Sequence, residues 1–180
     1  KKLTDADFFD GGDPKSVGDY ARAKGLRLLG LSEAYAFNAW NDAMAAKVQL
    51  LIDQAKAAGA ESISLIPRND APVYVSDEAR LAALREALAA IKPMLEKADM
   101  IGLVEPLGFL SSSLRSKQEA VDAIKAVGAE GRFKLVHDTF HHHLAGGGPI
   151  FPEYTGIVHI SGVVDPALKP EEMQDGHRIL

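Results

Sequence analysis

Short apolar runs recur along the chain at intervals that suit buried β-strands. The runs are continuously apolar rather than alternating, which is typical of parallel strands covered on both faces. Their centres lie about 23 to 39 residues apart, which is the spacing of successive strand–helix units in a parallel sheet. The five runs are Leu26–Leu31, Ser62–Pro67, Met100–Glu105, Phe133–Asp138 and Ile157–Ser161.

Helical patterns fill the intervals between these runs. Asp13 before Pro14 predicts an N-cap followed by a first-turn proline. A capping box that begins at Ser116 predicts the start of a later helix. The third helix has one apolar stripe, and Pro93 within it is expected to kink or tighten its last turn. The four predicted helices are Asp13–Gly25, Asn41–Ala58, Leu81–Leu95 and Ser116–Gly128.

Two architectures accommodate five strand–helix units: an open doubly wound sheet and part of a (β/α)8 TIM barrel. A complete barrel needs about 250 residues, whereas this chain has 180. The segment Phe8–Gly12 is typical of a loop that arrives from an earlier strand, and Asp175–Leu180 supplies no closing element. For a barrel we therefore expect a single α/β domain over residues 1–180 that lacks the N-terminal strands and the last strand.

Composition and charge limit the classes of function. The chain is 47% hydrophobic and 25% charged, as a globular domain is. Its formal net charge of −5 argues against nucleic acid as a partner, because binding of phosphates needs a basic surface. The absence of cysteine excludes disulfides, thiolate metal sites and a cysteine nucleophile. Without a membrane-spanning run or a signal peptide, the sequence predicts a soluble, cytoplasmic protein with no membrane partner.

Charged and imidazole side chains stand where four of the predicted strands end. Arg68 follows the second strand, Glu105 ends the third, Asp138 ends the fourth after His137, and His159 lies near the end of the fifth. In parallel α/β folds the carboxyl ends of strands carry the functional groups. An open sheet places its ligand between two strands, so four converging strand ends favour the barrel.

Glu105, Asp138 and His159 form a mixed set of oxygen and nitrogen donors. Two carboxylates and an imidazole suit one divalent metal ion, and Mn²⁺, Mg²⁺, Co²⁺ and Zn²⁺ all stay open. Taken alone, Glu105 is also typical of a loop residue, Asp138 of a helix cap and His159 of a core histidine. His141 follows Asp138 by one helical turn and would face the same cavity if the chain is helical there. The next two histidines are expected in solvent or in a loop.

Three further features leave alternatives open. Arg68 either binds an anionic or polyhydroxyl substrate or forms a surface ion pair with Asp70. The segment Gly146–Pro149 lacks the lysine and hydroxyl residue of a phosphate-binding loop, so a flexible loop or a turn is expected. Aromatic residues after the first strand either form an apolar wall for a sugar ring or pack in the core. These residues are Tyr35, Phe37 and Trp40.

Three segments around the strand ends resemble the xylose isomerase-like TIM barrel superfamily: Leu103–Pro106, Val136–His141 and Val158–Ser161. This superfamily contains sugar isomerases and epimerases, among them inosose isomerase, hydroxypyruvate isomerase and the ketose 3-epimerases. The run Asp-Thr-Phe-His in the second segment is the most specific part. The resemblance covers Leu26 to Arg178 and corresponds to the third to seventh strands of the family's barrel.

The resemblance implies a role for each of these residues. Glu105, Asp138 and His159 correspond to three of four ligands to one divalent metal ion, and Glu105 would also act as acid and base in catalysis. His141 and Arg178 correspond to substrate-binding residues. The family's fourth ligand, a glutamate on its eighth strand, has no counterpart in this sequence.

The function implied by the resemblance is metal-dependent isomerisation or epimerisation of a sugar, an inosose or a small hydroxy-carbonyl compound through an enediolate, within carbohydrate metabolism. The expected partners are a sugar-like small molecule and a second copy of the chain in a homo-oligomer. Two alternatives stay open. An endonuclease-IV-like DNA repair enzyme would need more metal ligands and an electropositive surface, and a non-catalytic barrel relative would show no turnover.

Overall fold

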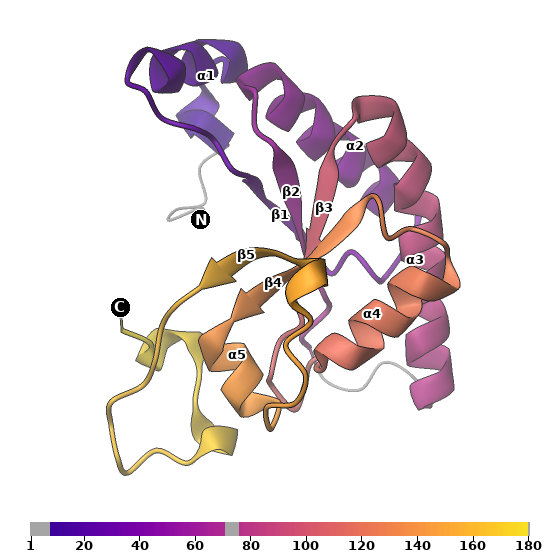
Figure 1. Ribbon diagram of the computed structural model, residues 1–180, viewed down its shortest axis with the longest axis vertical. Coiled ribbons are helices and arrows are strands. Elements are labelled where there is room, and N and C mark those ends of the chain that lie inside the picture. The colour runs from indigo at the N-terminus through magenta and orange to yellow at the C-terminus, as the bar shows by residue number, and fades with distance from the viewer. Residues whose placement is uncertain (1–7, 71–75, 180) are drawn as a thin grey trace.

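A parallel sheet forms the centre of the structure (Figure 1). The structure is a computed structural model and describes residues 8–70 and 76–179. Neighbouring strands are all parallel and follow one another in chain order, β1-β2-β3-β4-β5. The strands are β1 (Leu31–Tyr35), β2 (Ser62–Ile66), β3 (Ile101–Val104), β4 (Phe133–Asp138) and β5 (Thr155–His159).

This strand order is that of a barrel. In a doubly wound sheet the order reverses at a switch point, whereas the strands of a (β/α)8 barrel follow one another around a ring. The five parallel strands are in sequential order. The described residues therefore form part of a TIM barrel, as the converging strand ends predicted.

Helices cover the outer side of this sheet, and a short helix lies at its carboxyl end (Figure 1). Four longer helices precede or connect the strands, and a shorter one follows β4 directly. The helices are α1 (Pro14–Ala23), α2 (Asp42–Ala58), α3 (Asp77–Ala98), α4 (Lys117–Ala126) and α5 (Thr139–Leu144). The short 3-10 turns are η1 (Phe8–Gly11), η2 (Pro152–Tyr154), η3 (Pro170–Glu172) and η4 (Asp175–His177).

The predicted helix starts are confirmed by their caps. The side chain of Asp13 accepts a hydrogen bond from a backbone N–H of α1, and that of Asn41 does the same for α2. Ser116 and Glu119 form the predicted capping box of α4. Such caps satisfy N–H groups that the first helical turn leaves without partners. The third helix runs through Pro93 to its end at Ala98.

The first predicted strand was wrong in its position. The apolar run Leu26–Leu31 precedes the strand, which spans Leu31–Tyr35, and Leu26 is 61% exposed. The criterion failed because β1 is not apolar on both faces. Ala34 is buried in the core, whereas Glu33 on the same strand lines a cavity. The fifth strand begins and ends two residues earlier than Ile157–Ser161, at Thr155–His159.

The main core lies between the sheet and the helices. Along α3 the predicted apolar stripe is buried, and it packs with alternating residues of the strands. Burying each such side chain contributes about 1.5–3 kcal/mol. A second, smaller cluster lies beyond the carboxyl ends of the strands and contains Ile66, Leu107, Phe109 and Phe140. This smaller cluster supports α5 and the residues that α5 carries.

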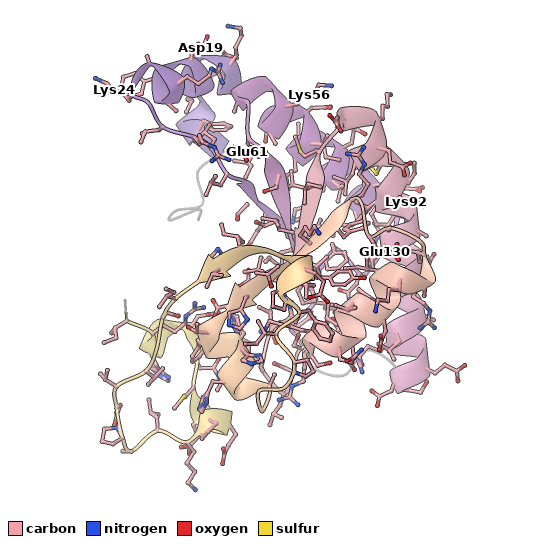
Figure 2. All side chains as sticks on the ribbon, viewed as in Figure 1. Asp19, Lys24, Lys56, Glu61, Lys92 and Glu130 are labelled. Atoms are coloured by element: carbon pink, nitrogen blue, oxygen red, sulfur yellow. The ribbon has the colours of Figure 1, made fainter. Side chains whose placement is uncertain are left out.

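Charged side chains lie at the amino end of the sheet, opposite the carboxyl ends of the strands. Figure 2 labels several of them, and Glu61 and Glu130 among them lie just before the strands β2 and β4 begin. Among the helices in residues 8–70 and 76–179, none is long and apolar enough to cross a membrane.

Gly108 sets the distance between α5 and the loop that follows β3. A Cβ atom at this position would lie 2.3 Å from the backbone oxygen of His141 and 2.5 Å from Cβ of Leu144. The guanidinium of Arg115 holds the same two segments together, since it donates hydrogen bonds to the carbonyls of Gly108 and Leu144. The close approach therefore requires glycine.

We expect Gly108→Ala to lower the free energy of unfolding by about 1–3 kcal/mol, because an overpacked contact must move backbone. Urea denaturation followed by circular dichroism measures this change. Gly131→Ala is the matched control, because a Cβ there meets no atom within 4 Å. Equal stability of the two variants would contradict the assigned role of Gly108.

Candidate functional site

Glu105 is placed at the sheet's carboxyl end by the pairing of β2 and β3. Its backbone N–H donates to the carbonyl of Leu65 over 3.2 Å, which extends the pairing by one residue beyond β3. The side chain is only 11% exposed. A carboxylate with so little access to water needs charged or hydrogen-bonding neighbours to compensate for lost solvation.

Asp138 has two functions at the junction of β4 and α5. Its Oδ1 atom accepts hydrogen bonds from the backbone N–H groups of Phe140 and His141, over 2.8 and 3.0 Å. Asp138 is thus the N-cap of α5, one of the alternatives that the sequence left open. Its Oδ2 atom faces the cleft, where it lies 4.0 Å from Nδ1 of His159. One oxygen serves the fold, and the other is directed at the site.

Two imidazoles approach the carboxylates. Nδ1 of His159 lies 3.7 Å from Oε1 of Glu105, and Nε2 of His141 lies 4.0 Å from the same oxygen. His141 is on α5 as the helical interpretation required, and the rings of Phe109 and Phe140 pack against it at centroid distances of 5.0 and 5.3 Å. The strand ends and the first turn of α5 therefore bring both histidines to Glu105.

Arg178, which directly follows the turn η4, closes the cluster from a position far along the chain from Asp138. Its Nη2 donates to Oδ2 of Asp138 over 2.5 Å, and its Nη1 donates to Asp175 over 2.8 Å. Its Nε donates to the hydroxyl of Ser161 over 2.7 Å. The sequence predicted Arg178 as a substrate-binding residue, and the structure places it at the same cleft.

These residues line a cavity of about 410 Å³. Its volume falls within the range of about 300–1,000 Å³ that is typical of small-molecule sites. The lining combines carboxylates, imidazoles and one guanidinium with a few apolar side chains. The residues are Ser32, Glu33, Tyr35, Ile66, Asn69, Glu105, Leu107, Asp138, His141, His159, Asp175 and Arg178.

Several of these residues were missed by sequence reasoning. Glu33 was missed because the first strand was placed too early. The available signal was the change from charged Glu33 to small, apolar Ala34, because neighbouring residues on a strand point to opposite faces of the sheet. Asp175 lies three residues before Arg178, so a helical turn there would have paired the two. Asn69 stood beside Arg68 in the sequence but was assigned no role.

Arg68 is not among the residues that line this cavity. Its guanidinium donates to Asp70 over 2.5 Å, which is the ion pair that the sequence offered as an alternative. Arg68 lines a neighbouring cavity of about 600 Å³ together with Arg80 and Arg115. The structure therefore does not bring Arg68 together with Glu105 and Asp138.

The aromatic residues after the first strand divide between the two roles considered. Phe37 is fully buried in the core, and Trp40 packs against that core. Tyr35 lines the cavity, and its hydroxyl accepts a hydrogen bond from the backbone N–H of Asn69 over 3.2 Å. Only Tyr35 is placed to contact a ligand in this cavity.

The loop and histidine expectations had different outcomes. Gly146, Gly147 and Gly148 all have positive φ, and they form the expected turn after α5.

His142 was expected in solvent or a loop, which was wrong. It lies on α5, partly buried, with Nδ1 3.0 Å from Nζ of Lys117. Its ring also lies 5.0 Å from that of His137.

The donor atoms fit a single metal ion. Glu105, Asp138 and His141 each offer one ligand atom, and these atoms lie within 4.8 Å of one another. His159 stands 3.7 and 4.0 Å from the same two carboxylates. Two ligands that each lie about 2.1 Å from one cation are at most about 4.2 Å apart, and both distances from His159 fall within this limit. All these donors are hard oxygens or imidazole nitrogens, which suit a divalent ion.

The two imidazoles differ in their electrostatic surroundings. The neighbouring Glu105 carboxylate raises the pKa of His159 above its usual value. Burial lowers the pKa of His141, against the attraction of Asp138 and Glu105. His141 is therefore held in the neutral form near neutral pH, in which an imidazole nitrogen can accept a hydrogen bond or bind a metal.

Acidification is expected to remove the contribution that three buried or partly buried histidines make to the stability of the fold. Burial lowers the pKa values of His137, His141 and His142, so the unfolded chain binds protons at these positions before the folded chain does. Their contribution is fully present above the ordinary histidine pKa of about 6.5 and is lost as the pH falls below it. His159 acts in the opposite direction because its pKa is raised.

We expect His142→Asn to show a smaller loss of unfolding free energy between about pH 7 and pH 5 than the unchanged protein, since one lowered pKa is removed. Asparagine keeps an amide near Lys117. Urea denaturation at both pH values measures the loss. His143→Asn is the control, because His143 is exposed on the same helix. A loss in His142→Asn as large as in the control would contradict this assignment.

Comparison with known proteins agrees with the barrel fold that the strand order indicates. A family model described as xylose isomerase-like TIM barrel matches residues 5–175. A xylose isomerase domain containing protein from Salmonella typhimurium is 33% identical, with a TM-score of 0.82 over 95% of this chain and 62% of that one. A search of curated proteins found no match.

Two more distant structures share the fold. The IolI protein, solved with a zinc atom bound, is 15% identical, with a TM-score of 0.84 over 96% of this chain and 64% of that one. A D-allulose 3-epimerase from Methylomonas sp. is 19% identical, with a TM-score of 0.63 over 86% and 60%. The chain thus spans about three fifths of the length of each of these proteins.

Proposed function

The chain belongs to the xylose isomerase-like TIM barrel family, and from this premise we propose that it is a metal-dependent isomerase or epimerase of a sugar, an inosose or a small hydroxy-carbonyl compound. The observation that carries the proposal is the group of two buried carboxylates and two imidazoles at the carboxyl ends of the strands. An epimerase of a ketose and a zinc-binding protein share this fold, which supports both the reaction class and the cofactor.

The proposed ligands of one divalent ion are Glu105, Asp138 and His159. The ion is Mn²⁺, Mg²⁺, Co²⁺ or Zn²⁺, all of which accept such donors. When bound, it would supply Lewis acidity that polarises a substrate carbonyl and stabilises an enediolate. Asp138 is suited to be a ligand because its N-cap bonds fix the carboxylate while Oδ2 still faces the cleft.

Glu105 is the proposed acid and base. Its side chain lies on the cavity wall at the end of β3, where a carboxylate can remove the proton from the carbon next to the substrate carbonyl. Return of the proton to the neighbouring carbon gives isomerisation. Delivery of a proton to the opposite face of the same carbon gives epimerisation and needs a second acid.

His141 and Arg178 are proposed to bind substrate oxygens. Nε2 of His141 is directed at Glu105 and Asp175 across the cavity, and its neutral imidazole can donate or accept a hydrogen bond. The guanidinium of Arg178 lines the same cavity and donates in a fixed planar arrangement. Together they would hold a hydroxyl and a carbonyl in register with Glu105.

We further propose that residues 1–180 are part of one barrel domain. The chain covers 62% and 64% of two related structures, and its five strands are consecutive members of a ring that has eight in the complete fold.

We expect Asp138→Asn to lower the affinity for Mn²⁺ by about a hundredfold or more, because a charged ligand becomes neutral. Asparagine still caps helices, so the melting temperature should change little. Elemental analysis after dialysis gives the stoichiometry, and isothermal titration gives the affinity. Asp99→Asn is the control, since Asp99 pairs with Arg132 on the surface. Unchanged Mn²⁺ affinity in Asp138→Asn would remove Asp138 from the site.

Catalysis is tested without knowledge of the substrate by proton exchange. Ketohexoses and an inosose are incubated with the protein and Mn²⁺ in D₂O, and loss of the C–H signal next to the carbonyl is followed by NMR. We expect exchange that depends on Mn²⁺ and falls by about 10²–10⁴-fold in Glu105→Gln, which lacks the base. Glu61→Gln, which alters a surface pair with Arg27, should exchange normally. Full exchange in Glu105→Gln would exclude Glu105 as the base.

A further inference from the structure

Arg178 occupies the oxygen of Asp138 that the proposed metal ion would use. Oδ1 of Asp138 is committed to two backbone N–H groups at the start of α5. Oδ2 accepts the hydrogen bond from Nη2 of Arg178 over 2.5 Å. The carboxylate itself is only 2% exposed, so the guanidinium rather than water balances much of its charge.

We propose, on the basis of the function proposed above, that Arg178 and the divalent ion compete for Oδ2 of Asp138, and that arrival of the ion breaks the Nη2–Oδ2 hydrogen bond and frees Nη2 to donate to the substrate. Arg178 would then couple metal binding to substrate binding. This role differs from that of a substrate contact alone, because it makes Arg178 an opponent of the metal until the ion displaces it.

The contacts of Arg178 support such a change at one edge only. Nε is bound to the hydroxyl of Ser161, Nη1 is bound to Asp175, and the guanidinium carbon lies 4.9 Å from the ring centre of Phe140. These three contacts anchor the group without involving a proposed metal ligand. The remaining contact, from Nη2 to Asp138, is the one that a cation would disturb.

Electrostatics makes the competition unavoidable. A divalent ion bound to Oδ2 would lie within a few ångströms of a guanidinium that is protonated at all accessible pH values. Like charges at such a distance repel strongly where water is largely excluded, and the Arg178 side chain is only 19% exposed. The ion therefore binds more weakly while Arg178 stays at Asp138, and more tightly once Arg178 has moved.

There is space on both sides of Arg178 for this movement. Arg178 lines the central cavity and also a second cavity of about 500 Å³, which it shares with Val158 and Ile179. An edge released from Asp138 stays in the central cavity, where its N–H groups can donate to an oxygen of the substrate. Because binding linkage is reciprocal, a substrate held by Arg178 would raise the affinity for the metal by the same factor.

The test is the affinity for Mn²⁺ alone, measured by isothermal titration on the protein without substrate. Arg178→Met removes the charge but keeps a long apolar side chain on Phe140. We expect this variant to bind Mn²⁺ about tenfold more tightly or better, whereas Arg178→Lys, which keeps a charge, stays closer to the unchanged protein. Arg132→Met is the matched control, because Arg132 pairs with Asp99 away from the cavity, and its affinity should not change.

The outcomes separate this inference from the proposed function. Mn²⁺ binding by the unchanged protein without tighter binding by Arg178→Met would overturn the inference and leave the proposed function standing. No Mn²⁺ binding by the unchanged protein or any of the variants would overturn both. Binding by Arg178→Met alone would support the competition strongly.

A second measurement covers the case in which Arg178→Met does not fold. The Nε–H signal of Arg178 in ¹⁵N-labelled protein is followed by NMR while Mg²⁺ or Zn²⁺, which are diamagnetic, is added. We expect this signal to shift as the ion binds, and to stay in place in Asp138→Asn. Saturation with the ion without any change at Arg178 would overturn the competition.

Discussion

The junction between β4 and α5 depends on the two hydrogen bonds that Asp138 accepts from the backbone of α5. These bonds start the helix directly at the end of the strand, with no loop between the two elements. They turn the chain so that His141, one helical turn later, faces back toward Glu105. They also fix the carboxylate of Asp138, so the same residue that shapes the junction presents Oδ2 to the cleft. A change of this residue would alter fold and site together unless the replacement still caps the helix.

Parallel strand pairing supplies the remaining constraint. Because β3, β4 and β5 are parallel, their carboxyl ends lie at one edge of the sheet, where Asp138 pairs with His159. Glu105 and Asp138 are thereby buried side by side near two imidazoles, an arrangement that costs solvation free energy and would be selected against in a purely structural core. The small apolar cluster around Phe109 and Phe140 holds α5 against this edge. The fold thus stabilises an arrangement that is unfavourable by itself, as functional sites often require.

The parts of this site that could be predicted from the sequence are those fixed by local rules. Strand ends followed by polar residues predicted Glu105, Asp138 and His159 at one edge, and the helix caps at Asp13 and Ser116 were predicted from side chains that bond their own next turn. The register of β1 was not predictable from an apolar run, because Glu33 faces a polar cavity. The approach of Asp175 and Arg178 to Asp138 depends on the path of a long irregular segment after β5, for which the sequence carries no periodic signal.

The charges around the cavity bear on the type of substrate. Among the described residues that line it, four carboxylates, those of Glu33, Glu105, Asp138 and Asp175, surround a single guanidinium that is already paired with two of them. A divalent ion would reduce this negative excess without reversing it. An anionic substrate would therefore meet net repulsion from these groups, whereas a neutral polyhydroxyl compound can donate hydrogen bonds to the carboxylates that the ion and Arg178 leave free. If the proposed function holds, this lining favours a neutral ketose or inosose over an anionic compound.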